Sequence, residues 1–352
     1  MNNELYFGAL ELLKKKIAIP SYSGDEKSAS DLIENYLNAA GIATFRIANN
    51  VCAYSRNNKE GRKLLMLNSH LDTVKATQAY TFNPFEAIEK DEKIFGLGSN
   101  DAGASLVSLI QSFIYLSTIE LPYNLLLALS CEEEISGAKG MQLIVNTIQN
   151  IDCAIIGEPT EMKAAIGERG LIVVDGTACG IVGHAAREEG LNALYVAIED
   201  INFIRNYEFE KTSPLMGEIK KTVTMINGGY QHNIIPDSCK FVIDIRPNEC
   251  YTNDEIVNLL QSGVKSELYA RSLEHKCSFT PENHPLILCA KALKVETYIS
   301  PTTSDWIRLK IPAVKMGPGS SSRSHSADEF VYIDEIKQGI KGYVDFLLNL
   351  QL

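Results

Sequence analysis

Side chains that commonly bind metals follow four strand-like stretches of the sequence, each at the point where the stretch ends. They are His70 and Asp72 after residues 64–67, Glu132, Glu133 and Glu134 after residues 125–129, Glu158 after residues 153–156, and His325 after residues 313–316. Asp101 adds a carboxylate just before an expected helix that begins at Ala102. Since ligands of open α/β sheets lie beyond the carboxyl ends of the strands, we expect these side chains to meet at one edge of a sheet.

Histidine and carboxylate ligands together suit Zn²⁺, Mn²⁺ or Co²⁺. The set is larger than one tetrahedral zinc ion requires, and it suits two ions that share a bridging carboxylate. Such a pair can hold a carbonyl group and lower the pKa of a bound water. Asp72 is placed to orient the imidazole of His70. Within the glutamate run, one side chain could bind metal while its neighbour serves as general base.

Each of these residues also has an ordinary interpretation when it is taken alone. These are a surface or core histidine (His70), a helix N-cap (Asp101), a solvated acidic loop (residues 132–134), a turn (Glu158) and an inert loop residue (His325). The coherent order of the strand ends along the chain favours the metal site over these interpretations.

The elements that must position these residues indicate an α/β protein with an insertion. The length of 352 residues predicts about two domains. Strand-like stretches alternate with helical patterns at residues 4–16, 24–40 and 102–116, which predicts a mostly parallel sheet with helices on both faces. Beyond residue 165 the order becomes strand, helix, two strands and helix, at residues 171–177, 192–204, 222–226, 240–245 and 254–264. We therefore expect a catalytic domain formed by residues 1–164 and 280–352, interrupted by an α+β domain at residues 165–279.

The amino-acid composition limits the possible binding partners of the protein and its cellular compartment. Acidic residues outnumber basic ones 44 to 33, and the net charge of −11 argues against a nucleic-acid or anionic-membrane partner. The sequence contains no apolar run of the roughly 18–20 residues that span a membrane, and its first residues do not form a secretion signal. Its eight cysteines form no Cys-x-x-Cys pair, and several lie in apolar stretches. We therefore expect a cytoplasmic protein whose thiols stay reduced.

A series of motifs extends over nearly the whole chain. They are NSHLDTV at residues 68–74, GLGSND at 96–101, EEE at 132–134, GEP at 157–159, MGPG at 316–319 and SHSADEF at 324–330. In composition and order this series resembles the dizinc aminoacylase-type metallopeptidase family, which includes acetylornithine deacetylase, succinyl-diaminopimelate desuccinylase and glutamate carboxypeptidase. The last two motifs resemble most closely the acetylornithine deacetylases and the related deacylases of lysine biosynthesis.

The resemblance implies a role for each ligand-type residue. His70 and Glu158 would bind one Zn²⁺ (or Co²⁺), Glu134 and His325 would bind the second, and Asp101 would bridge the two ions. Asp72 would support His70. Glu133 would be the general base and acid, with Glu132 as the alternative if the register of the glutamate run differs by one.

The resemblance extends to the inserted segment, which would form a lid and the interface of a homodimer. His184 in GHAA (183–186) would stabilise an oxyanion in the neighbouring subunit's site. Asn233 in NIIP (233–236) and Arg246 in DIR (244–246) would hold the substrate, as would Gly319 in the catalytic domain. Without the resemblance, His184 reads as a surface residue and Arg246 as an ordinary ion-pair partner.

The activity that the resemblance implies is hydrolysis of a small-molecule N-acyl amino acid, either N-acetyl- or N-succinyl-ornithine, in arginine biosynthesis. Alternatives within the family are succinyl-diaminopimelate desuccinylase and a metallo-dipeptidase or carboxypeptidase. A succinyl group would need a cationic partner, for which Arg169, Arg187 and Arg323 are candidates. Asp305 is interpreted either as a contact for a substrate amine or as a turn residue.

Overall fold

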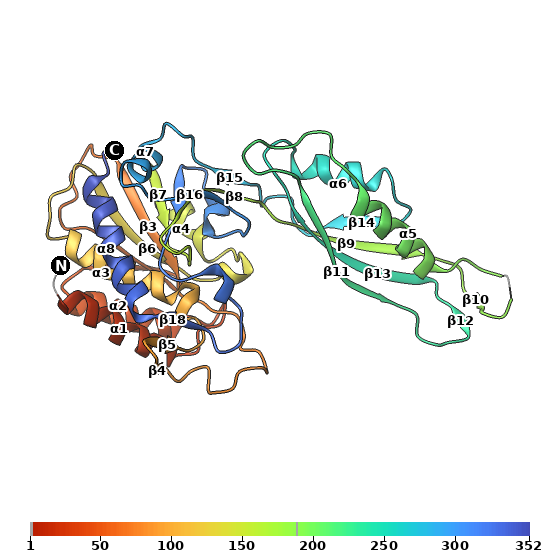
Figure 1. Cartoon of the computed structure of the whole chain (residues 1–352), viewed down its shortest axis with the longest axis horizontal. Helices are drawn as coiled ribbons and strands as arrows, with labels where there is room; N and C mark the ends of the chain where they lie inside the picture. The colour runs from red at the N-terminus through yellow and green to blue at the C-terminus, as the bar shows by residue number, and fades with distance from the viewer. Residues whose placement is uncertain (1–2, 188) are drawn as a thin grey trace. The chain divides into compact units, whose positions relative to one another are not determined.

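The computed structural model describes residues 3–187 and 189–352, and its chain divides into two compact units (Figure 1). The first unit comprises Met1–Gly167, Phe279–Tyr298 and Ser304–Leu352. The second comprises Glu168–Ser278 and Ile299–Thr303. The first unit therefore contains three stretches of chain, which the two segments of the second unit separate in sequence.

A mixed sheet forms the centre of the first unit. Among the described residues its strand order is β1 (Thr44–Ile47), β2 (Asn50–Tyr54), β6 (Asn124–Ser130), β3 (Leu64–His70), β7 (Cys153–Ile156), β17 (Ala313–Lys315), β8 (Ala164–Glu168) and β15 (Ser278–Phe279), with β16 (Thr297–Ser300) also paired to β8. The four central strands β6, β3, β7 and β17 are parallel, with Leu67 opposite both Leu127 and Ile155. This confirms the largely parallel α/β sheet predicted from the sequence.

Both faces of the central strands are buried, and alternate residues enter two different cores. Leu65 and Leu67 of β3 belong to one core, whereas Met66 between them belongs to the other. The first core is closed by α1 (Asn3–Ile17), α2 (Lys27–Ala39), α3 (Ala104–Leu116), α7 (Pro285–Ala292) and α8 (Ile333–Asn349), and the second by α4 (Met141–Thr147) and Trp306. Covering both faces explains why these strands are apolar throughout. None of the helices in the described parts of the chain combines the length and apolar character needed to cross a membrane.

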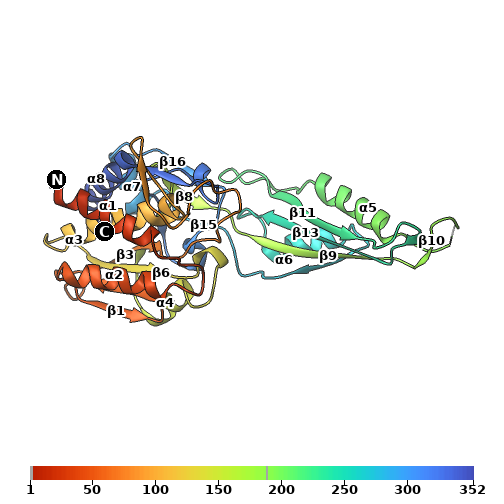
Figure 2. The ribbon, with the colours of Figure 1, turned by 90° about the horizontal axis from the view of Figure 1, so that it is seen from below.

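The second unit is an antiparallel sheet with two helices packed on one face. Its strand order is β11 (Lys220–Gly228), β13 (Ser238–Arg246), β9 (Ile172–Cys179) and β14 (Glu267–Ala270), and a separate short ladder joins β10 (Gly183–His184) to β12 (Ile234–Ile235). Alternate residues of β9, such as Ile172 and Val174, share one core with α5 (Ala193–Asn206) and α6 (Asn253–Gln261). Figure 2 shows α5 running alongside β11 and β13.

The segment around Asp101 differs from the expectation of a helix that begins at Ala102. Residues Ser99–Gly103 form an irregular turn, η1, in which Asp101 has φ −114° and ψ 101°, and α3 begins at Ala104. Asp101 therefore does not cap the helix, because the N-cap position is Gly103 and no side chain caps it. This irregular backbone leaves the Asp101 carboxylate free to face the sheet edge.

The last helix offers a direct test of the packing in the first unit. Leu347 is fully buried in the core that α8 shares with α3, whereas its neighbour Leu348 is 42% exposed. We expect Leu347→Ala to lower the free energy of unfolding by about 2–5 kcal/mol, because it leaves a cavity in a close-packed core. Leu348→Ala is the matched control and should change it by less than about 0.5 kcal/mol. Urea unfolding of both variants measures the difference, and equal effects would contradict the described packing.

Candidate metal centre

The carboxyl ends of the parallel strands bring most of the predicted ligands together. His70 is the last residue of β3, and Glu158 follows β7 by two residues. Glu133 and Glu134 lie in a short helical turn, η2 (Glu133–Ile135), after β6. His325 lies in the connection between β17 and β18 (Phe330–Tyr332). Because the strands are parallel, the segments that follow them leave the sheet at the same edge.

Two groups of donor atoms form at this edge, and Asp101 belongs to both. In the first group, Nε2 of His70 lies 3.3 Å from Oδ1 of Asp101 and 3.9 Å from Oε1 of Glu158. In the second, Nε2 of His325 lies 2.9 Å from Oε2 of Glu134 and 3.8 Å from Oδ2 of Asp101. The two oxygens of one carboxylate thus face different histidines, which is the arrangement required of a bridging ligand.

The chemistry of the donors fits two divalent cations. Within each group the donor atoms lie within 4.8 Å of one another, and each group combines one imidazole nitrogen with two carboxylates. Zn²⁺ and Co²⁺ accept this combination of nitrogen and oxygen ligands. The structure therefore brings all five predicted metal ligands into two groups of the expected membership.

Asp72 organises the site in a different way from the one expected. The hydrogen bond to Nδ1 of His70 involves the backbone carbonyl of Asp72 at 3.0 Å, while the nearest carboxylate oxygen is 3.6 Å away. This carbonyl can accept only from a protonated Nδ1, so in the neutral imidazole Nε2 is the nitrogen available to a metal. The Asp72 carboxylate instead accepts the backbone N–H groups of Glu133 at 3.0 Å and Glu134 at 3.1 Å, and the hydroxyl of Ser23 at 2.7 Å.

The three consecutive glutamates have different environments. The Glu132 residue adopts a left-handed backbone conformation (φ 55°), and its Oε2 accepts the N–H of Lys139, within the same loop. Burial raises the pKa of Glu133 well above its usual range, and the carboxylates of Glu158 and Asp305 raise it further against the opposing effect of His70. Glu133 therefore lies in the electrostatic field of the donor groups, whereas the Glu132 carboxylate is hydrogen-bonded within its own loop.

The pKa of Glu158 shifts in the same direction as that of Glu133. Burial raises the pKa of Glu158 to about 8, although the nearby His70 opposes the shift. Two divalent cations at the donor groups would offset this accumulation of negative charge.

Glu329 supports the centre, although the sequence analysis did not single it out. Its buried carboxylate accepts the backbone N–H groups of Gly98, Asn100 and Asp101, each at 2.8 Å. These bonds hold the irregular turn that presents the Asp101 carboxylate. The only sequence signal was the position of Glu329 inside the SHSADEF motif, four residues after His325.

Asp305 is buried at the ends of two strands of the sheet. It lies in η3 (Asp305–Arg308), is buried, and accepts hydrogen bonds from the hydroxyl of Ser130 and, at 3.4 Å, from the amide of Asn68. Burial raises its pKa to about 6 against the effect of the Ser130 hydrogen bond. Asp305 therefore connects the ends of β3 and β6 and is not an exposed turn residue.

Three of the predicted residues belong to the second unit, where the structure describes their local contacts. His184 is exposed, and its Nδ1 accepts the N–H of Ala186 at 3.1 Å. Asn233 lies beside it, because the N–H of Ala185 donates to the Asn233 carbonyl at 3.0 Å. The guanidinium of Arg246 forms a two-pronged ion pair with Asp244, at 2.7 and 2.9 Å. The ordinary interpretation of Arg246 as an ion-pair partner thus describes its present contacts.

Gly319 lies next to the turn that carries Asp101. Its φ is +90°, and a Cβ at this position would approach the Asn100 side-chain oxygen to 2.5 Å, so only glycine fits here. Of the arginines considered for a succinyl group, Arg323 pairs with Glu335 at 2.6 Å. Arg169, in the second unit, donates to backbone carbonyls, including that of Glu218 at 2.6 Å.

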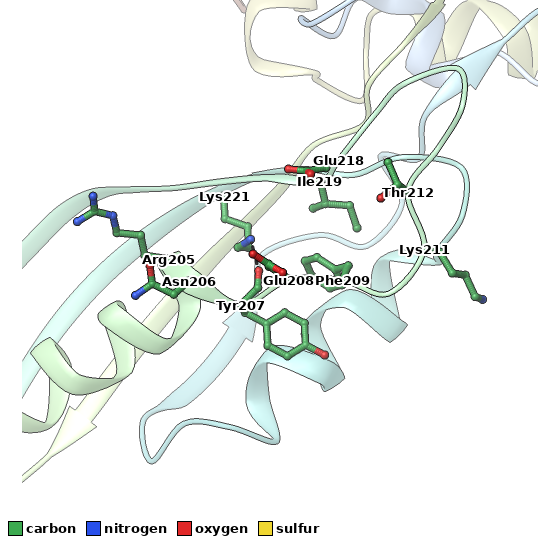
Figure 3. A pocket seen from close by; sticks show the side chains of 10 residues that line it. All are labelled: Arg205, Asn206, Tyr207, Glu208, Phe209, Lys211, Thr212, Glu218, Ile219 and Lys221. Carbon is green, nitrogen blue, oxygen red and sulfur yellow. Dashed lines mark hydrogen bonds between the residues drawn. The ribbon is translucent and has the colours of Figure 1, made fainter.

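A cavity of about 440 Å³ lies elsewhere, in the second unit (Figure 3). Its described lining residues come from the end of α5, the following loop and the start of β11, and include Arg205, Phe209 and Lys221. None of the predicted site residues is among them. This cavity is therefore separate from the donor groups.

Comparison with known proteins identifies the family. Residues 66–349 match the family model described as "Peptidase family M20/M25/M40". Acetylornithine deacetylase of Proteus mirabilis is 27% identical over 92% of this chain and 91% of its own length. An uncharacterised metallohydrolase of Methanocaldococcus jannaschii is 27% identical over 90% of each chain.

Solved structures show the same fold. A tripeptidase from Staphylococcus aureus superposes with a TM-score of 0.81 at 18% identity, over 97% of each chain. A metallo-carboxypeptidase from Sulfolobus solfataricus gives 0.76 at 17% identity, over 97% of this chain and 99% of its own. The family match covers most of the sequence and includes the segments that carry the donor groups. The chain belongs to peptidase family M20/M25/M40 and is a metallohydrolase of that family.

Proposed function

We propose that this enzyme hydrolyses the amide bond of an N-acyl amino acid, with N-acetyl- or N-succinyl-ornithine as substrate and ornithine as product. The observation that carries the proposal is the position of Asp101, which faces His70 with one carboxylate oxygen and His325 with the other. The relatives named acetylornithine deacetylase support the choice of substrate. A role in arginine biosynthesis follows from that substrate.

In this proposal His70, Asp101 and Glu158 would hold one Zn²⁺ or Co²⁺ ion, and Asp101, Glu134 and His325 would hold a second. When bound, such ions polarise the acyl carbonyl and make a water molecule more acidic.

Glu133 is proposed as the group that moves the proton. It takes a proton from the attacking water and delivers it to the nitrogen of the departing amine. Its position on η2, next to Glu134, supports this role, and the environment that raises its pKa would favour holding the proton between the two steps. Asp72 fixes this turn through the N–H groups of Glu133 and Glu134.

The second unit is proposed to bind the substrate and to form a homodimer. The exposed imidazole of His184 would stabilise the oxyanion in the partner's site, and the side-chain amide N–H of Asn233 would donate to the substrate carboxylate. Arg246 would release its ion pair with Asp244 and bind the substrate carboxylate instead. Exposed apolar side chains on α5 and the edge strand β11, including Tyr195 and Met225, support a dimer through this unit.

We also propose a cytoplasmic location, which the eight free cysteines support.

The substrate proposal is tested with the purified enzyme loaded with Zn²⁺ or Co²⁺ and assayed for amine release. We expect two ions per chain and faster turnover of N-acetyl- or N-succinyl-ornithine than of succinyl-diaminopimelate or dipeptides. The faster of the two ornithine amides identifies the acyl group. Two bound ions with preference for succinyl-diaminopimelate or a dipeptide would keep the amidase chemistry and refute ornithine. Failure to bind any divalent ion would refute the proposed centre.

The role of Glu133 is tested against its neighbour. We expect Glu133→Gln to retain both ions and the fold but to lower kcat by at least about 10³-fold, because no other group moves the proton. Glu132→Gln is the matched control, because the Glu132 carboxylate accepts the backbone N–H of Lys139. Its kcat should stay within about tenfold of that of the parent enzyme. The opposite ranking of the two variants in steady-state kinetics would assign the base to Glu132.

Action of His184 across a dimer is tested by complementation. His184→Ala should lower kcat without changing metal content, and Glu133→Gln should be inactive for a different reason. If His184 serves the partner's site, mixed dimers of the two variants contain one complete site and should recover up to about a quarter of the parent activity, as expected for random exchange of subunits. No recovery, although mass spectrometry shows mixed dimers, would contradict the proposal.

A further inference from the structure

One buried cation beneath the centre has no role in the mechanism above. Lys16 lies on the buried side of α1, with Leu12, Leu13 and Ile17, and is only 2% exposed. Burying an ammonium group in an apolar stripe is costly unless nearby charges compensate it. A lysine at this position therefore requires an explanation from its surroundings.

The surroundings of Lys16 are the supports of the metal ligands. Its Nζ donates to the hydroxyl of Ser21 at 3.1 Å, and that hydroxyl donates to the carbonyl of Leu71, between His70 and Asp72, at 3.0 Å. The same Nζ lies 3.4 Å from the position that a Cβ on Gly98 would occupy. The ammonium group is thus situated between the segment that carries His70 and the turn that carries Asp101.

The charge of Lys16 faces the acids of the centre. Burial lowers its pKa to about 8, and the carboxylates of Asp72, Glu329, Glu134 and Asp101 oppose the shift. At neutral pH the ammonium form therefore predominates. Ser21 is the one hydrogen-bond partner of Nζ that the described residues provide, so the long-range attraction of these acids is the main compensation for burial.

We propose that Lys16 is a built-in cation of the metal centre, which partly neutralises its carboxylates before divalent ions bind and thereby weakens the affinity for those ions. The inference rests on the metal centre proposed above. A fixed positive charge near the ligands stabilises the metal-free site and repels the incoming cations, so both effects act in the same direction on affinity. Lys16 is a positioning residue in this scheme, because it acts through the field at the ligands and not through contact with substrate.

The direction in which metal affinity changes when Lys16 is removed distinguishes this inference from a purely structural role. If Lys16 only held Ser21 and the His70 segment in place, its removal would loosen the ligands and weaken metal binding. If its charge is what matters, removal should tighten binding. Lys16→Met removes the charge and the hydrogen bond, and Lys16→Gln removes the charge but keeps a donor for Ser21.

Two control variants complete the design. Lys15→Met removes the same charge from the exposed neighbouring position on α1 and controls for net charge. Ser21→Ala removes the hydroxyl acceptor while the Lys16 ammonium remains. The measurement is the Zn²⁺ dissociation constant of the full chain, from competition with a chromophoric chelator at fixed pH and salt, together with the thermal midpoint with and without Zn²⁺.

We expect Lys16→Met and Lys16→Gln to bind Zn²⁺ about tenfold more tightly than the parent protein, and Lys15→Met to stay within about twofold. Ser21→Ala, which loses the hydrogen bond to the Leu71 carbonyl but keeps the Lys16 charge, should not tighten binding. The metal-free forms of both Lys16 variants should lose more thermal stability than their Zn²⁺-bound forms. A Lys16 variant that is folded with Zn²⁺ and unfolds when a chelator removes it would also support the inference. Unchanged or weaker Zn²⁺ binding, or equal destabilisation with and without Zn²⁺, would overturn it. If the parent protein itself bound no Zn²⁺, the proposed metal centre would fail first, and that result is distinguishable from the other two.

Discussion

Repulsion between buried carboxylates is the constraint on which the rest of the first unit depends. Asp72 and Glu158 are buried at one sheet edge, and Asp101 and Glu134 are partly buried there, and like charges at such distances disfavour one another in a medium of low polarity. The fold meets this constraint largely with backbone dipoles. Two N–H groups of the η2 turn donate to Asp72, and three N–H groups of the η1 turn donate to Glu329. Both turns are therefore shaped around a carboxylate.

The connection between α1 and α2 links these turns to the N-terminal part of the unit. Ser21 contacts Leu71, Ser23 contacts Asp72, and Glu26 accepts the N–H of Glu132 at 3.1 Å. A segment without any metal ligand thus positions both the His70 segment and the glutamate run. Precise catalytic geometry requires this kind of support, because a ligand is only as well placed as the backbone that carries it.

The sequence predicted the features that have a local pattern. Apolar stretches located the parallel strands, β7 to the residue, and the order of the strand ends indicated that His70, Glu158 and His325 would converge. Features that depend on contacts between residues far apart in the sequence could not be predicted from it. Glu26 and Glu132 are 106 positions apart, and Glu329 and Asp101 are 228 apart, so neither pair leaves a periodic signal. The irregular backbone at Asp101 was likewise hidden, since the apolar residues that follow it fit a longer helix equally well.

The shared ligand and its anchor have a consequence for biosynthesis of the chain. The first donor group is encoded by residues 70, 101 and 158, ahead of the second unit, whereas Glu329, which holds the Asp101 turn, is encoded after it. During translation the ribosome must therefore add residues 159–328, which include the second unit, before Glu329 is available to the turn. A polypeptide that ends prematurely after residue 158 therefore contains every member of one donor group without the support that shapes it. In the proposed metal centre, the shared ligand would therefore acquire its backbone support only after the second unit has been synthesised.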